Sequence, residues 1–398
     1  MENSALTLYL EINESNYIFF VSENDEQNNF KIIKELKIPL EGIEHNKFSD
    51  SEKSFNIIKD NIYLIEQKLN FTFKEIVLII DCFNPTFINL TGFKKLNGSQ
   101  VLRENITYIL NILKSCVDEI ESKKTVLHIF NSKFYLDNKE TENLPIGLFG
   151  DFYSHELSFA LINTNDQNNL KNIFKKCNLN IKKILIKSYI KGANISADYK
   201  NSDTFFYIKI NKNNAKIFYF ENNSLKFEQT FKFGTDIIIK DISKITYLKI
   251  DTIKMILDKI EIYNNVSGEE LIEESFFSNI GYRKIKKKLI YEIALARIEE
   301  ISEVMLFKNI NLTHYNKVSK NIFLEIDQKL RFKCLEKIYK KTFSNNERYN
   351  VNFIDTLLSE SFLNTAHKLV HFGWKKEAIP TIRTKKSLIV RLFEALFS

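Results

Sequence analysis

Glycine is scarce in this chain, which has only ten among its 398 residues. That is roughly a third of the usual content. No two glycines are adjacent, and the pattern Gly-x-Gly does not occur. Loops that cradle phosphate need glycine because the backbone N–H groups must approach the anion closely. The sequence therefore excludes the Walker loop, the Rossmann fingerprint and the kinase glycine-rich loop, and it lacks the G-x-S-x-G elbow of hydrolases.

Proline, cysteine and long apolar runs are also scarce. Four prolines are too few for long proline-rich linkers. Cys82, Cys116, Cys177 and Cys334 lie far apart without a C-x-x-C motif, so we expect reduced thiols rather than a zinc knuckle or a redox pair. The N-terminus lacks the features of a signal peptide, and no apolar run reaches the about 18 residues that a membrane span needs. These absences predict a cytoplasmic chain unless a segment holds it to a surface.

The composition that is present is typical of a folded protein with about two to four domains or lobes. Because the net charge of +7 is modest for this length, we expect no nucleic-acid partner. His367 and His371 are spaced i, i+4 on a predicted helix at 359–371, but Lys368 stands where a zinc motif has Glu. We therefore expect ordinary helix histidines, no metal site and no catalytic residue.

Hydrophobic patterns predict an α/β lobe at the start of the chain. Residues 6–12 and 17–21 predict two strands around a polar turn. Residues 53–69 have helical apolar spacing, and residues 75–81 predict a buried strand. Strands and helices in this order indicate one lobe of a mixed α/β fold.

A similar opening recurs in the second half of the chain. Residues 204–220 predict a hairpin that a strand at 225–231 extends, and helices dominate 240–307. A strand at 321–326 precedes a helix at 327–341. This weak internal repeat predicts two related lobes.

Residues 84–164 form a separate predicted module between these halves. It contains a helix at 99–122 and strands at 125–130 and 157–164. The turn region at 144–150 holds two of the ten glycines.

The last 26 residues, 373–398, carry the most distinctive pattern. In residues 385–398 the apolar side chains recur at helical spacing and form one broad face. Residues 373–398 contain six Lys or Arg and two Glu, a net charge of +4. This pattern suits a helix lying in the interface of an anionic bilayer, and the alternative is a terminal helix packed on the body of the protein. The residues assigned to membrane contact are Lys385, Lys386, Leu388, Ile389, Arg391, Leu392, Phe393, Leu396 and Phe397.

A second basic segment lies at a predicted helix start. The alternatives here are a solvated helix face and a docking site for an acidic peptide. Nucleic acid is disfavoured because no aromatic stacking platform is interleaved. The segment comprises Arg283, Lys284, Lys286, Lys287 and Lys288, with Arg297 further along.

The order of several motifs resembles the FtsA family of actin-like bacterial division proteins. VLHIF and FYLDNKETENLPIGLFG, in residues 126–150, are similar to the family's strand followed by F-x-L-D and N-P-x-G-M-x-G. Residues 233–243 resemble G-G-N-x-x-T-x-D-I-A, and LNTAHKLVHFG at 363–373 also fits. The terminal amphipathic segment is similar to the family's membrane-targeting sequence.

The resemblance implies an actin-like, ribonuclease H-like α/β fold of two lobes. It also implies an inserted small α/β subdomain and a C-terminal amphipathic helix. The expected boundaries are a first lobe of residues 1–83 and 165–203, an inserted subdomain of residues 84–164, a second lobe of residues 204–372 with a subdomain at about 246–310, a linker of residues 373–384 and the terminal helix of residues 385–398.

The resemblance also implies a nucleotide cleft, but the residues at its motifs have changed. Asn13 stands where the first phosphate hairpin has Gly, and LEIDQ at 324–328 replaces the adenosine motif L-T-G-G-G. Side chains at such turns obstruct backbone approach to phosphate, so we expect weak or absent ATP binding, no hydrolysis and no required cofactor. The positions of the eroded nucleotide site are Glu11, Asn13, Ser15, Lys209, Asn211, Lys212, Asn213, Gly234, Asp241, Ile326 and Asp327, of which Glu11, Ser15, Gly234 and Asp241 keep the residue of the family pattern.

The function that the resemblance implies is a membrane adaptor for cell division. It would anchor FtsZ to the cytoplasmic face of the inner membrane at the division site and recruit downstream division proteins. The basic segment would receive the acidic C-terminal peptide of FtsZ, and residues 84–164 would mediate self-association. The alternatives are an active ATPase of the actin/Hsp70 superfamily and a PilM-like platform protein.

Overall fold

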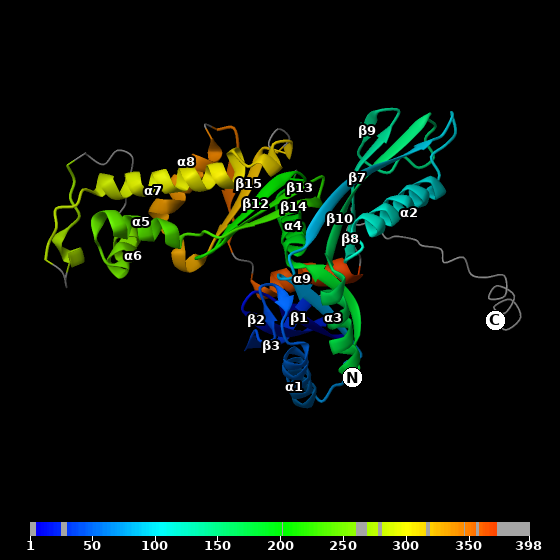
Figure 1. Cartoon of the computed structure of the whole chain (residues 1–398), viewed down its shortest axis with the longest axis horizontal. Helices are drawn as coiled ribbons and strands as arrows, with labels where there is room; N and C mark the ends of the chain where they lie inside the picture. Colours follow the sequence, from blue (N-terminus) through cyan, green and yellow to red (C-terminus); the bar gives the residue numbers. More distant parts are fainter. Residues whose placement is uncertain are drawn as a thin grey trace, which may run out of the picture. The chain divides into compact units, whose positions relative to one another are not determined.

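The computed structural model describes residues 5–24, 30–200, 202–259, 269–277, 281–315, 319–345, 347–355 and 358–371. The chain divides into two compact units. Unit 1 comprises Met1–Lys187 and His367–Ser398, and unit 2 comprises Ser188–Ala366 (Figure 1).

Unit 1 contains a five-stranded sheet of order β11-β6-β1-β2-β3. β1 pairs antiparallel with β2 and parallel with β6, and β6 pairs parallel with β11. β1 and β6 are rich in apolar residues because both faces of a central strand are buried. The register places Ile12, Ile80 and Ile186 side by side, so the carboxyl ends of three parallel strands meet at one edge. The strands are β1 (Ala5–Ile12), β2 (Asn16–Asn24), β3 (Phe30–Pro39), β6 (Glu75–Ile80) and β11 (Asn180–Ile186).

Two helices of unit 1, α1 (Ser51–Leu69) and α3 (Thr164–Lys176), contact each other. The carboxylate of Asp50 caps α1 by accepting the backbone N–H groups of Glu52 and Lys53. The short strands β4 (Ile43–Glu44) and β5 (Lys47–Phe48) form a hairpin just before α1.

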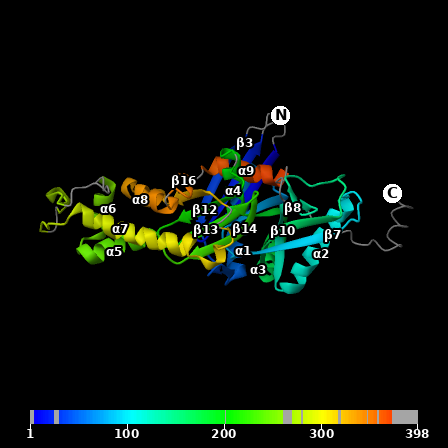
Figure 2. The ribbon, with the colours of Figure 1, turned by 90° about the horizontal axis from the view of Figure 1, so that it is seen from above.

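A second sheet of unit 1 has the order β7-β10-β8-β9 and packs against α2 (Arg103–Ile120). A Cβ atom on Gly92 would lie 2.5 Å from a methyl group of Ile109, so glycine allows α2 to lie close to β7. Figure 2 shows α2 running along this sheet. The strands are β7 (Thr86–Lys95), β8 (Lys124–Leu136), β9 (Lys139–Thr141) and β10 (Phe152–Asn163).

The five-stranded sheet of unit 2 has the order β14-β13-β12-β15-β16, which repeats the topology of the first sheet. A meander of three antiparallel strands is again followed by two parallel strands on its other side. This equivalence confirms the two related α/β lobes that the internal repeat predicts. The strands are β12 (Phe205–Ile210), β13 (Ala215–Glu221), β14 (Ser224–Phe231), β15 (Asn321–Ile326) and β16 (Asn350–Phe353).

Four of the helices that begin in unit 2 gather at one end of its sheet (Figures 1 and 2). These are α5 (Asp236–Thr246), α6 (Ile250–Lys259), α7 (Lys287–Ser302) and α8 (Lys333–Ser344). α4 (Lys187–Asp198) begins at the last residue of the first part of unit 1, and α9 (Ser359–His371) passes from unit 2 into unit 1.

Several predicted elements differ from those observed. β3, β7 and β16 were not predicted, and each is an edge strand of its sheet. β3 and β7 have no fully buried residue and β16 has one, so these strands lack the continuous buried apolar run that gives a sequence signal. The helix predicted at 327–341 begins at Lys333, after a 3-10 turn at Gln328–Leu330. Among the described residues, no helix has the length and apolar content needed to cross a bilayer. The predicted membrane helix at 385–398 lies outside the described residues.

Candidate functional sites

The turn between β1 and β2 is closed by its own side chain. Asn13 Oδ1 accepts the backbone N–H groups of Ser15 at 3.0 Å and Asn16 at 2.8 Å. In a phosphate-binding turn such N–H groups point at the anion. Here the carboxamide oxygen takes that role, and Asn13 Nδ2 donates to Glu11 Oε1 at 3.0 Å.

The carboxyl edge of the first sheet is joined by internal ion pairs. Lys187 Nζ lies 2.6 Å from Glu11 Oε1 and 3.5 Å from Asp81 Oδ2. Glu11 is buried, and the three residues lie at the ends of β1, β6 and β11. Open α/β sheets bind ligands at this edge. We assigned only Glu11 from sequence, although Asp81 and Lys187 each follow a buried strand directly, which is a usable signal.

The equivalent hairpin of unit 2 is also satisfied internally. Asn211 donates from its backbone to the Asn214 carbonyl at 2.9 Å and from Nδ2 to Asn214 Oδ1 at 2.6 Å. The carbonyl oxygens of Asn211 and Lys212 accept the N–H groups of Thr235 and Asp236, both at 3.0 Å. The turn is therefore tied to the loop before α5.

Gly234 is explained by this packing. A Cβ atom at position 234 would lie 2.2 Å from the Asn211 carbonyl oxygen and 2.6 Å from that of Lys212. Because both atoms belong to backbone, no side chain could move aside. Gly234 thus permits close packing of the loop on the hairpin.

The positions that resemble the adenosine motif lie at the end of β15. Ile326 is buried, and the backbone N–H of Asp327 donates to the Ile210 carbonyl at 3.1 Å. Asp327 Oδ1 accepts the N–H of Lys329 at 3.0 Å. A side chain again satisfies a backbone donor at a position where the family pattern has glycine.

A buried polar cluster lies beside these positions. Glu325 accepts a hydrogen bond from Tyr207 Oη at 2.9 Å and pairs with Lys191 Nζ at 3.3 Å. Lys209 is the neighbour of Glu325 in the β12–β15 register. Such buried charges are stable only as a paired group, which indicates a structural role for the cluster.

The basic segment forms a surface of ion pairs at the start of α7. Arg283 lies 3.4 Å from the carbonyl oxygens of Thr246 and Tyr247 at the end of α5. Asp241, grouped by resemblance with the nucleotide site, instead pairs with Arg297 and joins α5 to α7. The remaining pairs are Lys286 with Glu269 at 3.0 Å, Lys287 with Glu270 at 3.5 Å and Lys288 with Glu292 at 3.7 Å.

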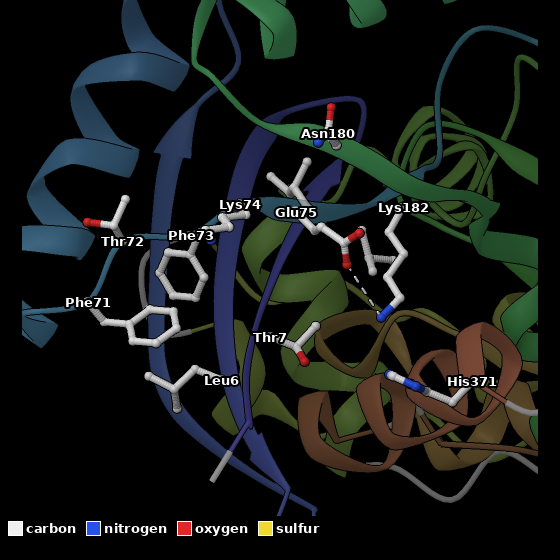
Figure 3. A pocket seen from close by; sticks show the side chains of 12 residues that line it. Leu6, Thr7, Phe71, Thr72, Phe73, Lys74, Glu75, Asn180, Lys182 and His371 are labelled. Atoms are coloured by element: carbon white, nitrogen blue, oxygen red, sulfur yellow. Dashed lines mark ion pairs between the residues drawn. The ribbon is translucent and has the colours of Figure 1, made fainter. Parts of the chain in front are cut away.

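A groove of about 680 Å³ lies at the opposite, amino edge of the first sheet (Figure 3). Leu6, Phe71 and Phe73 gather on one side of it. Lys182 and His371 lie on the other side, where Lys182 pairs with Glu75 at 3.6 Å. No local sequence pattern predicts this groove, because its walls come from segments far apart in the chain. The remaining lining residues are Thr7, Thr72, Lys74, Ile76, Val77 and Asn180.

The rings of His367 and His371 contact each other on α9 in a tilted arrangement, with centroids 4.2 Å apart and planes at 33°. His367 Nδ1 lies 3.0 Å from Tyr9 Oη. Burial lowers the pKa of His367 to about 4, with smaller effects from His371 and Lys182. Burial also lowers the pKa of His371. In the part of the chain that the structure describes, no three His, Cys, Asp or Glu side chains are grouped to hold a metal ion.

Comparison with known proteins gives no match at the sequence level. No family model matches the chain, and no curated protein matches it.

Comparison with solved structures is informative about the fold. The structure of a PilM–PilN type IV pilus biogenesis complex matches with a TM-score of 0.52 at 10% identity, covering 92% of this chain and 98% of that one. The chain has an actin-like fold. MreB5 of Spiroplasma citri bound to ADP gives a TM-score of 0.43 at 10% identity, with 92% and 95% covered. EutJ from Carboxydothermus hydrogenoformans gives 0.41 at 8% identity, with 94% and 91% covered.

Within this actin-like fold, most positions of the eroded nucleotide site lie on three turns, while Gly234 lies just before α5 and Asp241 within it. Glu11, Asn13 and Ser15 lie at the β1–β2 turn of unit 1. In unit 2, residues 209–213 lie at the β12–β13 turn and residues 326–327 at the end of β15. The residues assigned to membrane contact, 385–397, lie outside the described residues.

Proposed function

We propose that this chain is a divergent, FtsA-like membrane adaptor that binds partners and does not turn over nucleotide. The proposal that the chain does not turn over nucleotide rests on the β1–β2 turn. There, Asn13 Oδ1 accepts two backbone N–H groups that a bound phosphate would need. The turns at Asn211 and Asp327 support it, since their side chains also satisfy local partners. A nucleotide must break these bonds before it can bind.

A nucleotide titration tests the loss of ATP binding. We expect no change in melting temperature when Mg²⁺ and ATP are added to the full chain. A clear shift that requires Mg²⁺ would contradict this part of the proposal and favour the active ATPase alternative.

The membrane part of the proposal rests on the sequence of residues 385–398. A basic amphipathic helix of this kind binds anionic lipid reversibly, at the cytoplasmic face of the inner membrane in this proposal. Liposome flotation tests it. The full chain should float with anionic vesicles but not with neutral ones, and a chain ending at Gly373 should not float. If the full chain and the shortened chain both float, or if neither floats, the proposal that residues 385–398 tether the protein to the membrane is wrong.

The basic segment is the proposed docking site for the acidic C-terminal peptide of FtsZ. Exposed ion pairs such as Lys286–Glu269 are each worth about 1 kcal/mol or less, so an acidic peptide can replace the internal carboxylates. Reversing the charge of Lys284 and Lys288 should weaken binding of an acidic peptide several-fold, as measured by fluorescence anisotropy. Lys53→Glu, on α1 of unit 1, is the control and should leave peptide binding unchanged.

Self-association is proposed to use the second sheet of unit 1. Phe93 and Phe152 are exposed large apolar residues, and the β7–β10 register places them on one face of the sheet. Leu148 and Phe149, in the loop before β10, are exposed as well. Exposed apolar patches mark interaction surfaces. We expect Phe93→Ser combined with Phe149→Ser to reduce self-association in analytical ultracentrifugation.

A further inference from the structure

The groove at the amino edge of the first sheet ends beside the root of the C-terminal segment. His371, the last residue of α9, is one of its lining residues. Phe372, Gly373 and Trp374 follow directly, and Trp374 is the only tryptophan of the chain. Three residues of extended chain span at most about 10 Å, so Trp374 is within reach of the groove.

The size of the groove favours Phe372 and Trp374 as its occupants over the amphipathic segment at residues 385–398. Its volume of about 680 Å³ is that of a small-ligand pocket. A helix with its side chains is about 10–12 Å wide, and residues 388–397 would extend about 15 Å, so that helix is too large. One or two aromatic rings match the space.

The chemistry of the walls also favours an aromatic occupant. Phe71 and Phe73 pack edge to face, with ring centroids 4.9 Å apart, and Leu6 lies beside them (Figure 3). Phe71 belongs to this apolar wall and is nevertheless 41% exposed, so it has room for a further apolar contact. Aromatic rings pair favourably in such arrangements, and the indole N–H of a tryptophan could stay at the rim near Glu75.

We propose that Phe372 and Trp374 fill this groove and fix the root of the C-terminal segment to unit 1. If the membrane tether of the proposed function also holds, the free lead between groove and bilayer is residues 375–384. Ten residues reach at most about 35 Å, so the amino edge of the first sheet would be held toward the membrane. The docked groove would then set the orientation of unit 1 relative to the bilayer, while the amphipathic helix would supply the affinity for lipid.

Trp374 is a built-in reporter because no other tryptophan contributes to the fluorescence. In the full chain without vesicles, we expect blue-shifted emission and protection from quenching by acrylamide. Phe71→Glu places a charge in the groove and should reduce docking at least about ten-fold, seen as red-shifted emission and restored quenching. Tyr63→Glu is the matched control, since Tyr63 is an exposed aromatic of α1 in unit 1 that does not line the groove, and it should leave the emission unchanged.

Three outcomes would overturn the proposal. Trp374 in the unmodified chain could be as accessible to acrylamide as free tryptophan, a result that needs no variant to fold. Protection could persist in Phe71→Glu with unchanged circular dichroism, in which case Trp374 docks elsewhere. Protection that appears only as protein concentration rises would assign the groove to a second copy. Protection in a chain that fails to float with vesicles would support the groove and refute only the tether.

Discussion

One lysine lies near the start of strand β11 and another directly follows its end, and the two differ in their surroundings. Lys182, at the amino edge of the sheet, pairs with Glu75 at 3.6 Å, and the side chains are 35% and 56% exposed. Lys187, directly after the strand, pairs with Glu11 at 2.6 Å, and the side chains are 19% and 5% exposed. The same pair of residue types thus forms a surface contact at one edge and a buried link at the other.

The comparison shows how the two edges of one sheet have diverged. At the carboxyl edge, where this architecture binds ligands, the side chains of Asn13 and Lys187 both bond to Glu11. The amino edge, which has no such conventional role, carries an open apolar groove.

The largest expected effect is at the carboxyl edge. Lys187→Met leaves the buried Glu11 carboxylate without its ammonium partner, which should cost roughly 3 kcal/mol in the free energy of unfolding. Chemical denaturation measures this. The double variant Lys187→Met, Glu11→Gln should recover most of the loss because no buried charge is left unpaired. A loss no larger than that of Lys182→Met would remove the difference between the edges.

The next effect concerns pH, through His367 near the amino edge. Its pKa of about 4 lies below the ordinary 6.5, so the folded state keeps the ring neutral while the unfolded chain takes up a proton. The stability is therefore present above pH 6.5 and is lost as the pH falls toward 4, by roughly 2 kcal/mol between pH 7 and pH 5.

His367→Gln tests this pH dependence. Gln retains a polar group for Tyr9 but does not titrate, so denaturation curves at pH 7 and pH 5 should differ less than in the unmodified chain. The groups that face His367 are Tyr9, Asn24, Phe30, His371 and, at longer range, Lys182. An unchanged pH dependence would show that other groups cause the acid loss.

A smaller effect is expected at the β1–β2 turn. Asn13→Ala removes the acceptor of two backbone N–H groups and the donor to Glu11, but water can replace part of these bonds. We expect a loss of about 1 kcal/mol, measured as a lower melting temperature. A neutral result would show that the turn does not depend on its side chain, which would weaken the argument against phosphate binding.

The smallest effect is expected for Lys182→Met, at the amino edge. The exposed pair with Glu75 should contribute under about 1 kcal/mol to stability. The pKa of His371 gives a sharper measurement. Since Lys182 is one cause of its lowered pKa, the variant should raise that pKa in an NMR titration. An unchanged pKa would show that the Lys182 ammonium does not act on the His371 ring.

The sequence predicts much of the fold because its signals are local. The strand at 321–326 and the helix at 359–371 are observed at the predicted residues, and the two hairpins follow apolar runs around polar turns. β3, β7 and β16 were missed because they bury at most one residue each and lack such runs. In the candidate sites, Glu11 and Asn13 were found through their motif. The Asp241–Arg297 pair was not, since each residue was assigned to a different site.

The sequence by itself determined that the β1–β2 and β12–β13 turns contain no glycine, that two similar lobes follow one another, and that residues 385–398 have a basic amphipathic pattern. These properties depend on neighbouring residues. Only the tertiary structure decided that Glu11 pairs with Lys187, 176 positions away, and that Leu6, Phe71 and His371 share one groove. Residues so distant in sequence come together only through the order and packing of the strands in the sheet, and local sequence patterns do not specify that order.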